Sequence, residues 1–367
     1  MNYKFKTAGE LPETNTLPPL LINKDGEKIT TAEQWQSNRE YLKSMLKHYM
    51  YGDMPDNSQD YNVTGEVIFS EEIFSRKAIR EIVKIEFGVN NANKLALIAE
   101  ITRPNNSDKC RVITYIAFSN ARNYEVEEEA LKRGYAIALF NYEQLFPDKV
   151  ISEILPIQKM LGEDLELKAI ALWAFCNMRL IDYLETTDYA VKNNYVVTGH
   201  SRNGKAALCA GIFDDRVKIT VPNNSGCGGC GCYRFLGGRN GLTQDVKKTE
   251  SLETITTAFP HWFTKNLNQF YDAPGKNYSQ EQALNNKLPF DLHFNKSLIA
   301  PRAFLSLEAY GDEWANTYGS KLTHDAAKEV FDLLGVPDNI SIQFREGGHD
   351  FNTQDWFKLL DFCDLHK

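Results

Sequence analysis

Three segments in the first third of the chain alternate apolar and polar residues. They are residues 63–69, 78–87 and 94–102. A period of two is typical of strands with one buried and one solvated face, as in antiparallel sheets. The pattern therefore predicts three antiparallel strands. They follow a polar, proline-containing opening, in which we expect one helix from an N-cap at Thr31 to about Met50.

Beyond these segments the apolar positions become continuous, which is typical of strands that are buried on both faces. The strands expected from this second part are residues 112–118, 135–142, 195–197, 217–221, 301–308 and 340–344. Helical patterns separate them at residues 126–132, 168–186, 203–213, 324–334 and 353–365. Strands that alternate with helices predict the α/β class, with a doubly wound, mostly parallel sheet, an antiparallel N-terminal part and three layers.

An antiparallel opening followed by this alternation is the arrangement of an α/β-hydrolase. We predict one catalytic domain of that type over residues 1–367, since no repeat or low-complexity linker divides the chain. Within it, residues 1–60 form an N-terminal wrap and helix. The Gly-rich, aromatic residues 226–300 form an irregular insertion near the active site.

The composition narrows the class of protein. The chain is 43% hydrophobic and 25% charged, which is typical of globular proteins. Its net charge of -8 argues against a nucleic-acid partner, because such proteins carry basic patches. The sequence has no run of about 18 apolar residues, so we do not expect a membrane-spanning helix. The first residues lack the apolar core of a signal peptide. The protein is therefore expected to be cytoplasmic, or to be the mature form of a periplasmic or secreted protein whose signal has been removed. We also expect a monomer.

The segment Tyr195–Leu208 carries the strongest chemical signal. A β-forming stretch leads into Gly199-His-Ser-Arg-Asn-Gly204, and a helical pattern follows. A serine on a sharp strand-to-helix turn is a nucleophile elbow, and the free N–H groups of the helix N-terminus favour an oxyanion. Asn203 departs from the usual pattern, because it stands in the place of the second glycine. The alternative for Ser201 is a serine in an ordinary turn.

An activated serine needs a base, and the base needs a carboxylate that orients it. In an α/β-hydrolase the order along the chain is serine, acid, histidine. His349 follows the last expected strand in a glycine-containing loop, which makes it the candidate base. His293 is the main rival. The other histidines lie in expected helices or away from strand ends: His48, His261, His324 and His366.

The candidate acids lie at the end of the strand before last, which ends near Leu307, and in the turn after it. They are Glu308, Asp312 and Glu313. We favour Asp312 over Glu308, because it comes directly after a glycine at the apex of a turn and has a short, stiff side chain. The alternative is that all three are solvated charges of a turn.

Three of the seven cysteines lie close together in the sequence, at Cys227, Cys230 and Cys232. A structural zinc site needs four ligands, and the sequence offers no second pair with matching spacing. We therefore expect these thiols to pack as small apolar groups, and we expect neither a metal nor a cofactor.

Several motifs resemble one known family. They are Val-Thr-Gly-His-Ser-Arg-Asn-Gly-Lys-Ala-Ala (197–207), Val-Pro-Asn-Asn-Ser-Gly-Cys-Gly-Gly (221–229), Leu-Pro-Phe-Asp-Leu-His (288–293), Ile-Ala-Pro-Arg (299–302), and Gly-Gly-His-Asp (347–350) with Asp355-Trp356 behind it. The N-terminal Leu-Ile-Asn-Lys-Asp-Gly (21–26) fits as well. These motifs resemble those of the glucuronoyl esterases of the bacterial type, carbohydrate esterase family fifteen. The resemblance implies a metal-free serine hydrolase that cleaves esters between a (4-O-methyl-)glucuronate of glucuronoxylan and a lignin alcohol.

The resemblance also implies a role for individual residues. Ser201 matches the nucleophile, His349 the base, and Arg202 the arginine that helps to hold the oxyanion. Lys205 matches the lysine that contacts uronate hydroxyls, and Trp314 resembles the tryptophan that lines the sugar subsite. The alternatives for these last two are a lysine on the helix surface and a tryptophan in the core.

Two features depart from the family pattern. Many members place the catalytic glutamate directly before Ser-Gly-x-Gly-Gly, where this chain has Asn224. The acid must then be Asp312 or Glu308. Those members also have a disulfide at positions that are His200 and Asp350 here, and these two side chains either form a polar pair or point into water.

Two other functions stay open at this point. One is an acetylxylan esterase or another carbohydrate esterase of the same fold. The other lies outside the enzymes: a catalytically inactive, carbohydrate-binding homologue.

Overall fold

The computed structural model describes residues 3–55, 60–89, 94–106, 108–243, 246–271 and 284–367. The chain divides into two compact units. The first unit comprises Met1–Asp53 and Asn224–Asp350, and the second comprises Met54–Asn223 and Phe351–Lys367. The prediction of a single catalytic domain is not tested by this division and stays a prediction.

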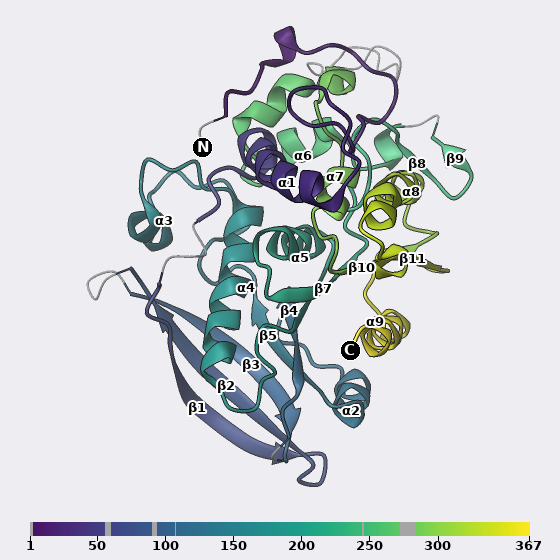
Figure 1. Ribbon diagram of the computed structural model, residues 1–367. Coiled ribbons are helices and arrows are strands. Elements are labelled where there is room, and N and C mark those ends of the chain that lie inside the picture. The colour runs from purple at the N-terminus through teal and green to yellow at the C-terminus, as the bar shows by residue number, and fades with distance from the viewer. Residues whose placement is uncertain (1–2, 56–59, 90–93, 107, 244–245, 272–283) are drawn as a thin grey trace. The chain divides into compact units, whose positions relative to one another are not determined.

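The second unit is built on a sheet of mixed direction. Its strands in chain order, β1 to β7, are Thr64–Ile73, Ala78–Phe87, Leu95–Pro104, Arg111–Ala117, Tyr135–Asn141, Tyr195–His200 and Val217–Asn223. They lie side by side in the order β1-β2-β3-β5-β4-β6-β7 (Figure 1). The pairs from β1 to β5 are antiparallel, and the pairs from β5 to β7 are parallel. This change from antiparallel to parallel pairing follows the change in the sequence from alternating to continuous apolar segments.

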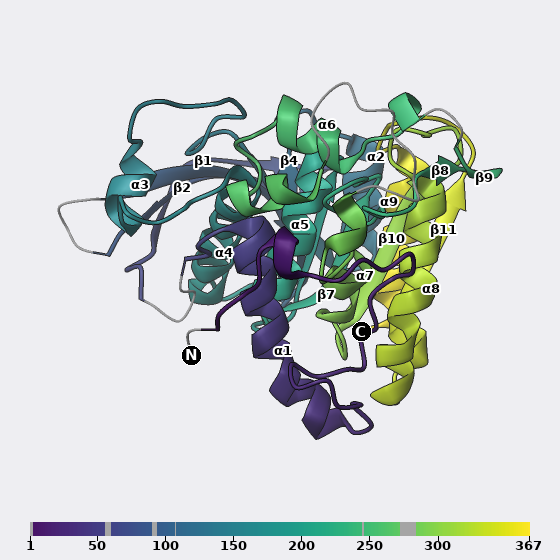
Figure 2. The ribbon, with the colours of Figure 1, turned by 90° about the horizontal axis from the view of Figure 1, so that it is seen from above.

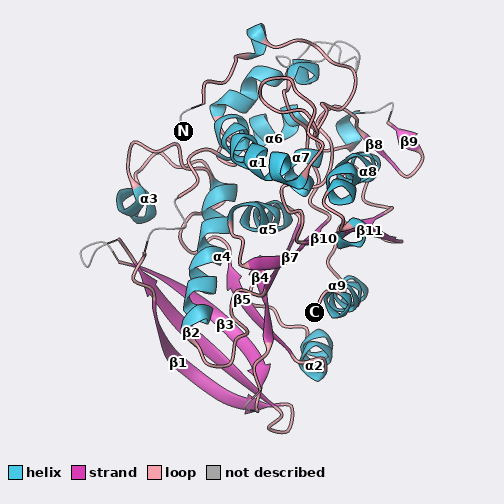
Figure 3. Ribbon diagram, viewed as in Figure 1, coloured by secondary structure: helices cyan, strands magenta, loops and turns pink. Residues whose placement is uncertain are grey.

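Helices cover both faces of this sheet. They are α2 (Tyr124–Lys132), α4 (Ala169–Thr186), α5 (Arg202–Phe213) and α9 (Thr353–Leu365), and the short helix α3 (Pro156–Leu161) lies to the side of the sheet (Figure 1). Helices α4 and α5 pack on one face, and α2 and α9 lie together on the other (Figures 1 and 3). Nearly every residue of α4 is buried, because this helix is apolar around most of its circumference. The second unit therefore has the three layers that the sequence predicts.

The first unit is mainly helical. Its helices are α1 (Ala32–Leu46), α6 (Leu252–Ala258), α7 (His293–Ser297) and α8 (Thr317–Leu333). Short helical turns are η1 (Ala8–Glu10), η2 (Lys47–Tyr51), η3 (Val246–Lys248), η4 (Lys265–Phe270), η5 (Leu284–Lys287) and η6 (Pro337–Asn339). Strands β10 (Ala303–Ala309) and β11 (Ile340–Arg345) are parallel, and β8 (Gly237–Gly238) pairs with β9 (Gly241–Leu242). Figure 2 shows α8 lying alongside β10 and β11, which it contacts.

The observed elements confirm the predicted fold class. Strand β2 and helix α9 have the predicted limits, whereas α8 begins at Thr317 rather than at His324. The reason is the cap: Asn316 adopts a left-handed conformation (φ 59°), and its Oδ1 accepts a hydrogen bond of 2.9 Å from the N–H of Gly319. The predicted insertion at 226–300 holds several short helices, and its residues 244–245 and 272–283 lie outside the described residues.

Among the described residues, no helix combines the length and the apolar character that are needed to cross a membrane.

Candidate active site

Ser201 lies on the turn between strand β6 and helix α5. Its backbone has φ 57° and ψ -124°, which is a strained conformation for a residue with a side chain. The surrounding chain holds it there: the N–H of Ser201 donates to the carbonyl of Asn223 at 2.9 Å, and its own carbonyl accepts from Lys205 N–H at 3.2 Å. A Cβ at Gly199 would meet the Asn203 carbonyl oxygen at 2.3 Å, so this turn needs a glycine there. The turn has the strained backbone of a nucleophile elbow.

Arg202 is held by an acid that the sequence analysis did not single out. One guanidinium nitrogen of Arg202 forms an ion pair with Oδ2 of Asp148, whose side chain is only 4% exposed. The hydroxyl of Tyr142 donates to the same oxygen at 3.2 Å. A guanidinium fixed by a buried carboxylate loses little further freedom when it binds an anion. No local pattern marks Asp148, because its partner lies far away in the chain.

Lys205 and Trp314 do not have the environments that their alternative roles require. Lys205 is 2% exposed, so it is not a lysine of the helix surface. Trp314 is 41% exposed, so it is not a core residue. A buried ammonium group and an exposed indole are both compatible with ligand binding, and their roles stay predictions.

In the first unit, the structure brings the predicted base and one predicted acid together. Oδ2 of Asp312, in the loop after β10, lies 2.5 Å from Nδ1 of His349, in the loop after β11. Oδ1 of Asp312 accepts from the N–H of Ala315 at 3.1 Å, which fixes the carboxylate in its orientation. The two loops are also joined through their backbones, because Gly311 N–H donates to the Gly347 carbonyl at 2.9 Å. A Cβ at Gly311 would approach that oxygen to 2.5 Å, which explains the glycine before the acid.

Glu308, the second candidate acid, has a different environment. It is completely buried within β10 and accepts a hydrogen bond of 2.6 Å from Ser306 Oγ. Burial raises the pKa of Glu308 to about 7, because the low-dielectric interior disfavours the carboxylate. Glu313 is exposed. The alternative that all three acids are solvated is therefore wrong, since Asp312 and Glu308 are both buried.

His293, the rival base, is a structural residue. It is buried, and its Nε2 lies 2.8 Å from the carbonyl oxygen of Pro18. Burial lowers the pKa of His293 to about 4, so the ring is neutral at neutral pH and Nε2 donates to this carbonyl.

Asn224, which stands in the place of the family's glutamate, forms a bridge. Its Oδ1 accepts from the N–H of Ala309 at 2.9 Å, and its Nδ2 donates to the carbonyl of Asp350 at 3.2 Å. These groups lie at the end of β10 and in the loop that carries His349. The amide thus connects the acid-bearing and base-bearing segments, and it supplies no carboxylate.

The residues at the two missing disulfide positions each have a partner in their own unit. His200 Nδ1 lies 2.6 Å from Asn223 Oδ1, and Asp350 forms an ion pair with Arg345. The prediction that His200 and Asp350 pair with each other stays a prediction.

The cysteine cluster is packed within the protein. Cys227, Cys230 and Cys232 are completely buried free thiols, and burial raises the pKa of the last two. Within the part of the chain that the structure describes, no group of three or more His, Cys, Asp or Glu side chains is arranged to hold a metal ion.

The fold and these side chains define a class of protein: a serine hydrolase of the α/β-hydrolase type. The comparison with known families is more specific, because the family described as "Glucuronyl esterase, fungi" matches residues 88–335. This chain belongs to the glucuronoyl esterase family.

The most similar relatives include bacterial and fungal proteins. A carbohydrate esterase from an unknown prokaryotic organism is 28% identical over 96% of this chain and 89% of its own length. The 4-O-methyl-glucuronoyl methylesterase 1 of Wolfiporia cocos is 26% identical over 90% of this chain and 76% of its own. A solved structure, a promiscuous esterase of carbohydrate esterase family 15 from a marine bacterial metagenome, has a TM-score of 0.80 and 27% identity. It covers 98% of this chain and 99% of that protein.

Proposed function

We propose that this protein hydrolyses esters of (4-O-methyl-)glucuronic acid, with Ser201 as nucleophile, His349 as base and Asp312 as the acid that orients the base. The observation that carries the proposal is the 2.5 Å bond between Asp312 and His349 Nδ1, in a chain of the glucuronoyl esterase family. That bond leaves Nε2 as the basic nitrogen of the ring.

The reaction proceeds in two halves. Ser201 Oγ attacks the ester carbonyl carbon and gives its proton to His349 Nε2. The tetrahedral intermediate then expels the alcohol, which takes the proton from His349, and a glucuronoyl ester of Ser201 is left. Water, deprotonated by the same nitrogen, attacks this ester and releases glucuronate and free Ser201. Asp312 keeps the imidazole in the required tautomer and stabilises its protonated form.

The negative charge of the intermediate needs donors. We assign this role to Arg202 and to the backbone N–H groups at the start of α5, where the helix dipole adds positive potential. Lys205 and Trp314 are proposed to bind the sugar ring, through hydroxyl groups and through its C–H face respectively. Because such substrates are glucuronoxylan–lignin esters of plant cell walls, we propose that the protein acts outside the cytoplasm. We also propose that it acts as a monomer.

The proposal predicts a strong preference between two small esters. Benzyl glucuronate should be hydrolysed with a kcat/KM at least about 100-fold above that for p-nitrophenyl acetate, because only the uronate uses the sugar contacts in the transition state. Steady-state kinetics on the purified enzyme measures this ratio. A preference for acetate would instead favour the acetylxylan esterase alternative. An enzyme that cleaves neither ester and is not labelled by a fluorophosphonate would be the inactive homologue.

Asp148 should act on the reaction only through Arg202. We expect Asp148→Asn to lower kcat for benzyl glucuronate by about 10- to 100-fold with little change in KM, because a misplaced guanidinium weakens a contact made to the developing oxyanion. Glu143→Gln is the matched control, since the Glu143 carboxylate accepts from the backbone N–H of Asp148, at 2.9 Å, whereas the Asp148 carboxylate itself holds the Arg202 guanidinium. Equal effects of the two variants, or a loss confined to KM, would contradict the positioning role of Asp148.

A further inference from the structure

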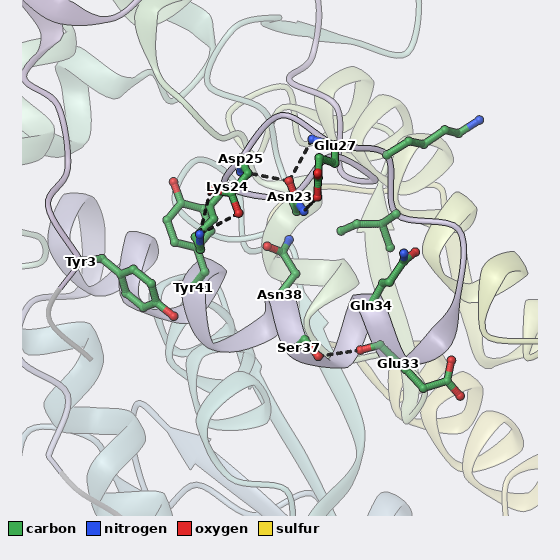
Figure 4. A pocket seen from close by; sticks show the side chains of 12 residues that line it. Tyr3, Asn23, Lys24, Asp25, Glu27, Glu33, Gln34, Ser37, Asn38 and Tyr41 are labelled. Atoms are coloured by element: carbon green, nitrogen blue, oxygen red, sulfur yellow. Dashed lines mark hydrogen bonds and ion pairs between the residues drawn. The ribbon is translucent and has the colours of Figure 1, made fainter.

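The first unit has a polar pocket that the proposed reaction does not use. It has a volume of about 620 Å³ and is lined by Tyr3, by the loop from Asn23 to Ile29 and by one side of helix α1 (Figure 4). None of its lining residues belongs to the candidate active site. Ligand pockets in proteins typically have volumes of roughly 300–1,000 Å³, so this pocket has the size of a small-molecule binding site.

The loop side of the pocket is preorganised. Asn23 Oδ1 accepts hydrogen bonds of 2.9 Å from the N–H groups of both Asp25 and Glu27, and Asn23 Nδ2 donates to Glu27 at 3.0 Å. Lys24 and Asp25 form an ion pair of 2.7 Å. The loop therefore presents carboxylate oxygens in fixed positions, and ordering it on ligand binding costs little entropy.

The helix side offers one donor that the protein itself does not satisfy. Asn38 is 5% exposed, and its Nδ2 is buried without a hydrogen-bond partner among the described residues. Figure 4 shows this side chain rising from α1 toward the loop that carries Asn23. A buried donor without an acceptor costs about 1–3 kcal/mol, so such a group calls for an acceptor in the pocket.

The third component of the pocket is aromatic. The rings of Tyr3 and Tyr41 lie 5.1 Å apart in an edge-to-face arrangement at one side of the pocket. The neutral Tyr41 hydroxyl can both donate and accept, and burial raises the pKa of Tyr41 further from neutral pH. Tyrosine rings present an apolar face and a polar tip, which suits a ligand that is itself apolar on its C–H face and polar at its edge.

The charges of the pocket argue against an ionic ligand. Asp25, Glu27 and Glu33 are nearly balanced by Lys24 and Lys28. An anion would meet the excess of carboxylates, and a cation would have to compete with the ion pair and the hydrogen bonds that these groups already make. Amides, carboxylates and hydroxyls together suit a ligand rich in hydroxyl groups, since hydroxyls donate and accept.

From this combination we propose that the pocket is a second carbohydrate-binding site, which takes a short stretch of a neutral pyranose chain. Asn38 Nδ2 donates to a sugar hydroxyl, the loop carboxylates accept from others, and Tyr41 contacts the C–H face of a ring. The choice of xylan among such chains rests on the proposed function, because a xylan ester carries the neutral main chain and the glucuronate on one polymer.

Binding is best measured on the Ser201→Ala protein, so that it does not depend on turnover. Calorimetric titration with xylohexaose should give a Kd of about 1 mM or tighter, and Asn38→Leu or Tyr41→Ala should weaken it by about tenfold. Ser44→Ala is the control: Ser44 lies on the same helix, where its hydroxyl donates to the Glu40 carbonyl at 2.8 Å, but it is outside the pocket. With Ser201 intact, the Asn38 and Tyr41 variants should hydrolyse benzyl glucuronate within about twofold of wild type, which reports that they fold.

The outcomes separate the two proposals. Binding of neither xylohexaose nor cellohexaose, or binding that is unchanged in both pocket variants, would overturn the second site whatever the enzyme does with benzyl glucuronate. Binding of cellohexaose in place of xylohexaose would keep the site and change the glycan. Binding of a glucuronate-bearing oligosaccharide alone would overturn the inference of a neutral ligand. Intact binding without esterase activity would leave the second site standing and refute the proposed function.

Discussion

Ser201→Ala is expected to lower kcat/KM for benzyl glucuronate by about 10⁴–10⁶-fold, while the protein stays folded. The reason is chemical: the hydroxyl oxygen is the atom that forms the acyl-enzyme, and no neighbouring group replaces it. His349→Ala should have an effect of the same order, and the double variant should be little worse than either single one, because nucleophile and base act as a unit. Steady-state kinetics and circular dichroism measure the two parts of this prediction.

The strained backbone supplies a control for this experiment. Ser201 has φ 57°, where a side chain is strained and glycine is not. We expect Ser201→Gly to be as inactive as Ser201→Ala but more resistant to unfolding by about 1 kcal/mol. Urea denaturation of the two variants compares their free energies of unfolding. Activity above a few per cent of wild type in either variant would refute the assignment of the nucleophile.

What the sequence predicts well is local. The nucleophile turn is marked by neighbouring residues: β-formers, a glycine forced by close packing against Asn203, and a helix after the serine. Strand β2 and helix α9 have clear periods of two and 3.6, so their limits are predicted correctly. The start of α8 is not, because Thr317, Gly319 and Ser320 are weak helix formers, and the Asn316 cap that initiates the helix has no apolar pattern behind it.

What the sequence does not predict depends on contacts between distant segments. Asp148 is one of many acidic residues until the fold places it against Arg202. Asn38 is one of many polar helix residues until the fold buries it in the wall of a pocket. The choice between Asp312 and Glu308 has the same origin, because one acid lies near the end of β10 and the other in the loop after it, both are buried, and their partners distinguish them.

Glu308→Gln tests whether Glu308, rather than Asp312, is the acid that orients His349. Because the pKa of Glu308 is raised to about 7, its protonated form is favoured in the folded state. The free energy that this group contributes to folding is present at acid pH and is lost as pH rises from about 4.5 to about 7. Glutamine is neutral at every pH, so the variant should lack this loss of stability while its activity stays within about tenfold of wild type.

Asp312→Asn should lower kcat by about 10³–10⁴-fold, far more than Asn224→Ala or Glu308→Gln. An asparagine in this place keeps the volume of the side chain, but its amide can donate to His349 Nδ1 and so favour the wrong tautomer, with the proton on Nε2. The loss should appear in kcat rather than in KM, since Asp312 orients the base and is not assigned a contact to the sugar. Asn224→Ala removes the two hydrogen bonds of 2.9 and 3.2 Å that connect β10 with the base loop, and we expect it to lower kcat by about tenfold and the stability by about 1–3 kcal/mol. If Glu308→Gln proved the more damaging change, the acid would be Glu308. Equal losses from Asp312→Asn and Asn224→Ala would show that the 2.5 Å bond to His349 positions the loop without serving the reaction.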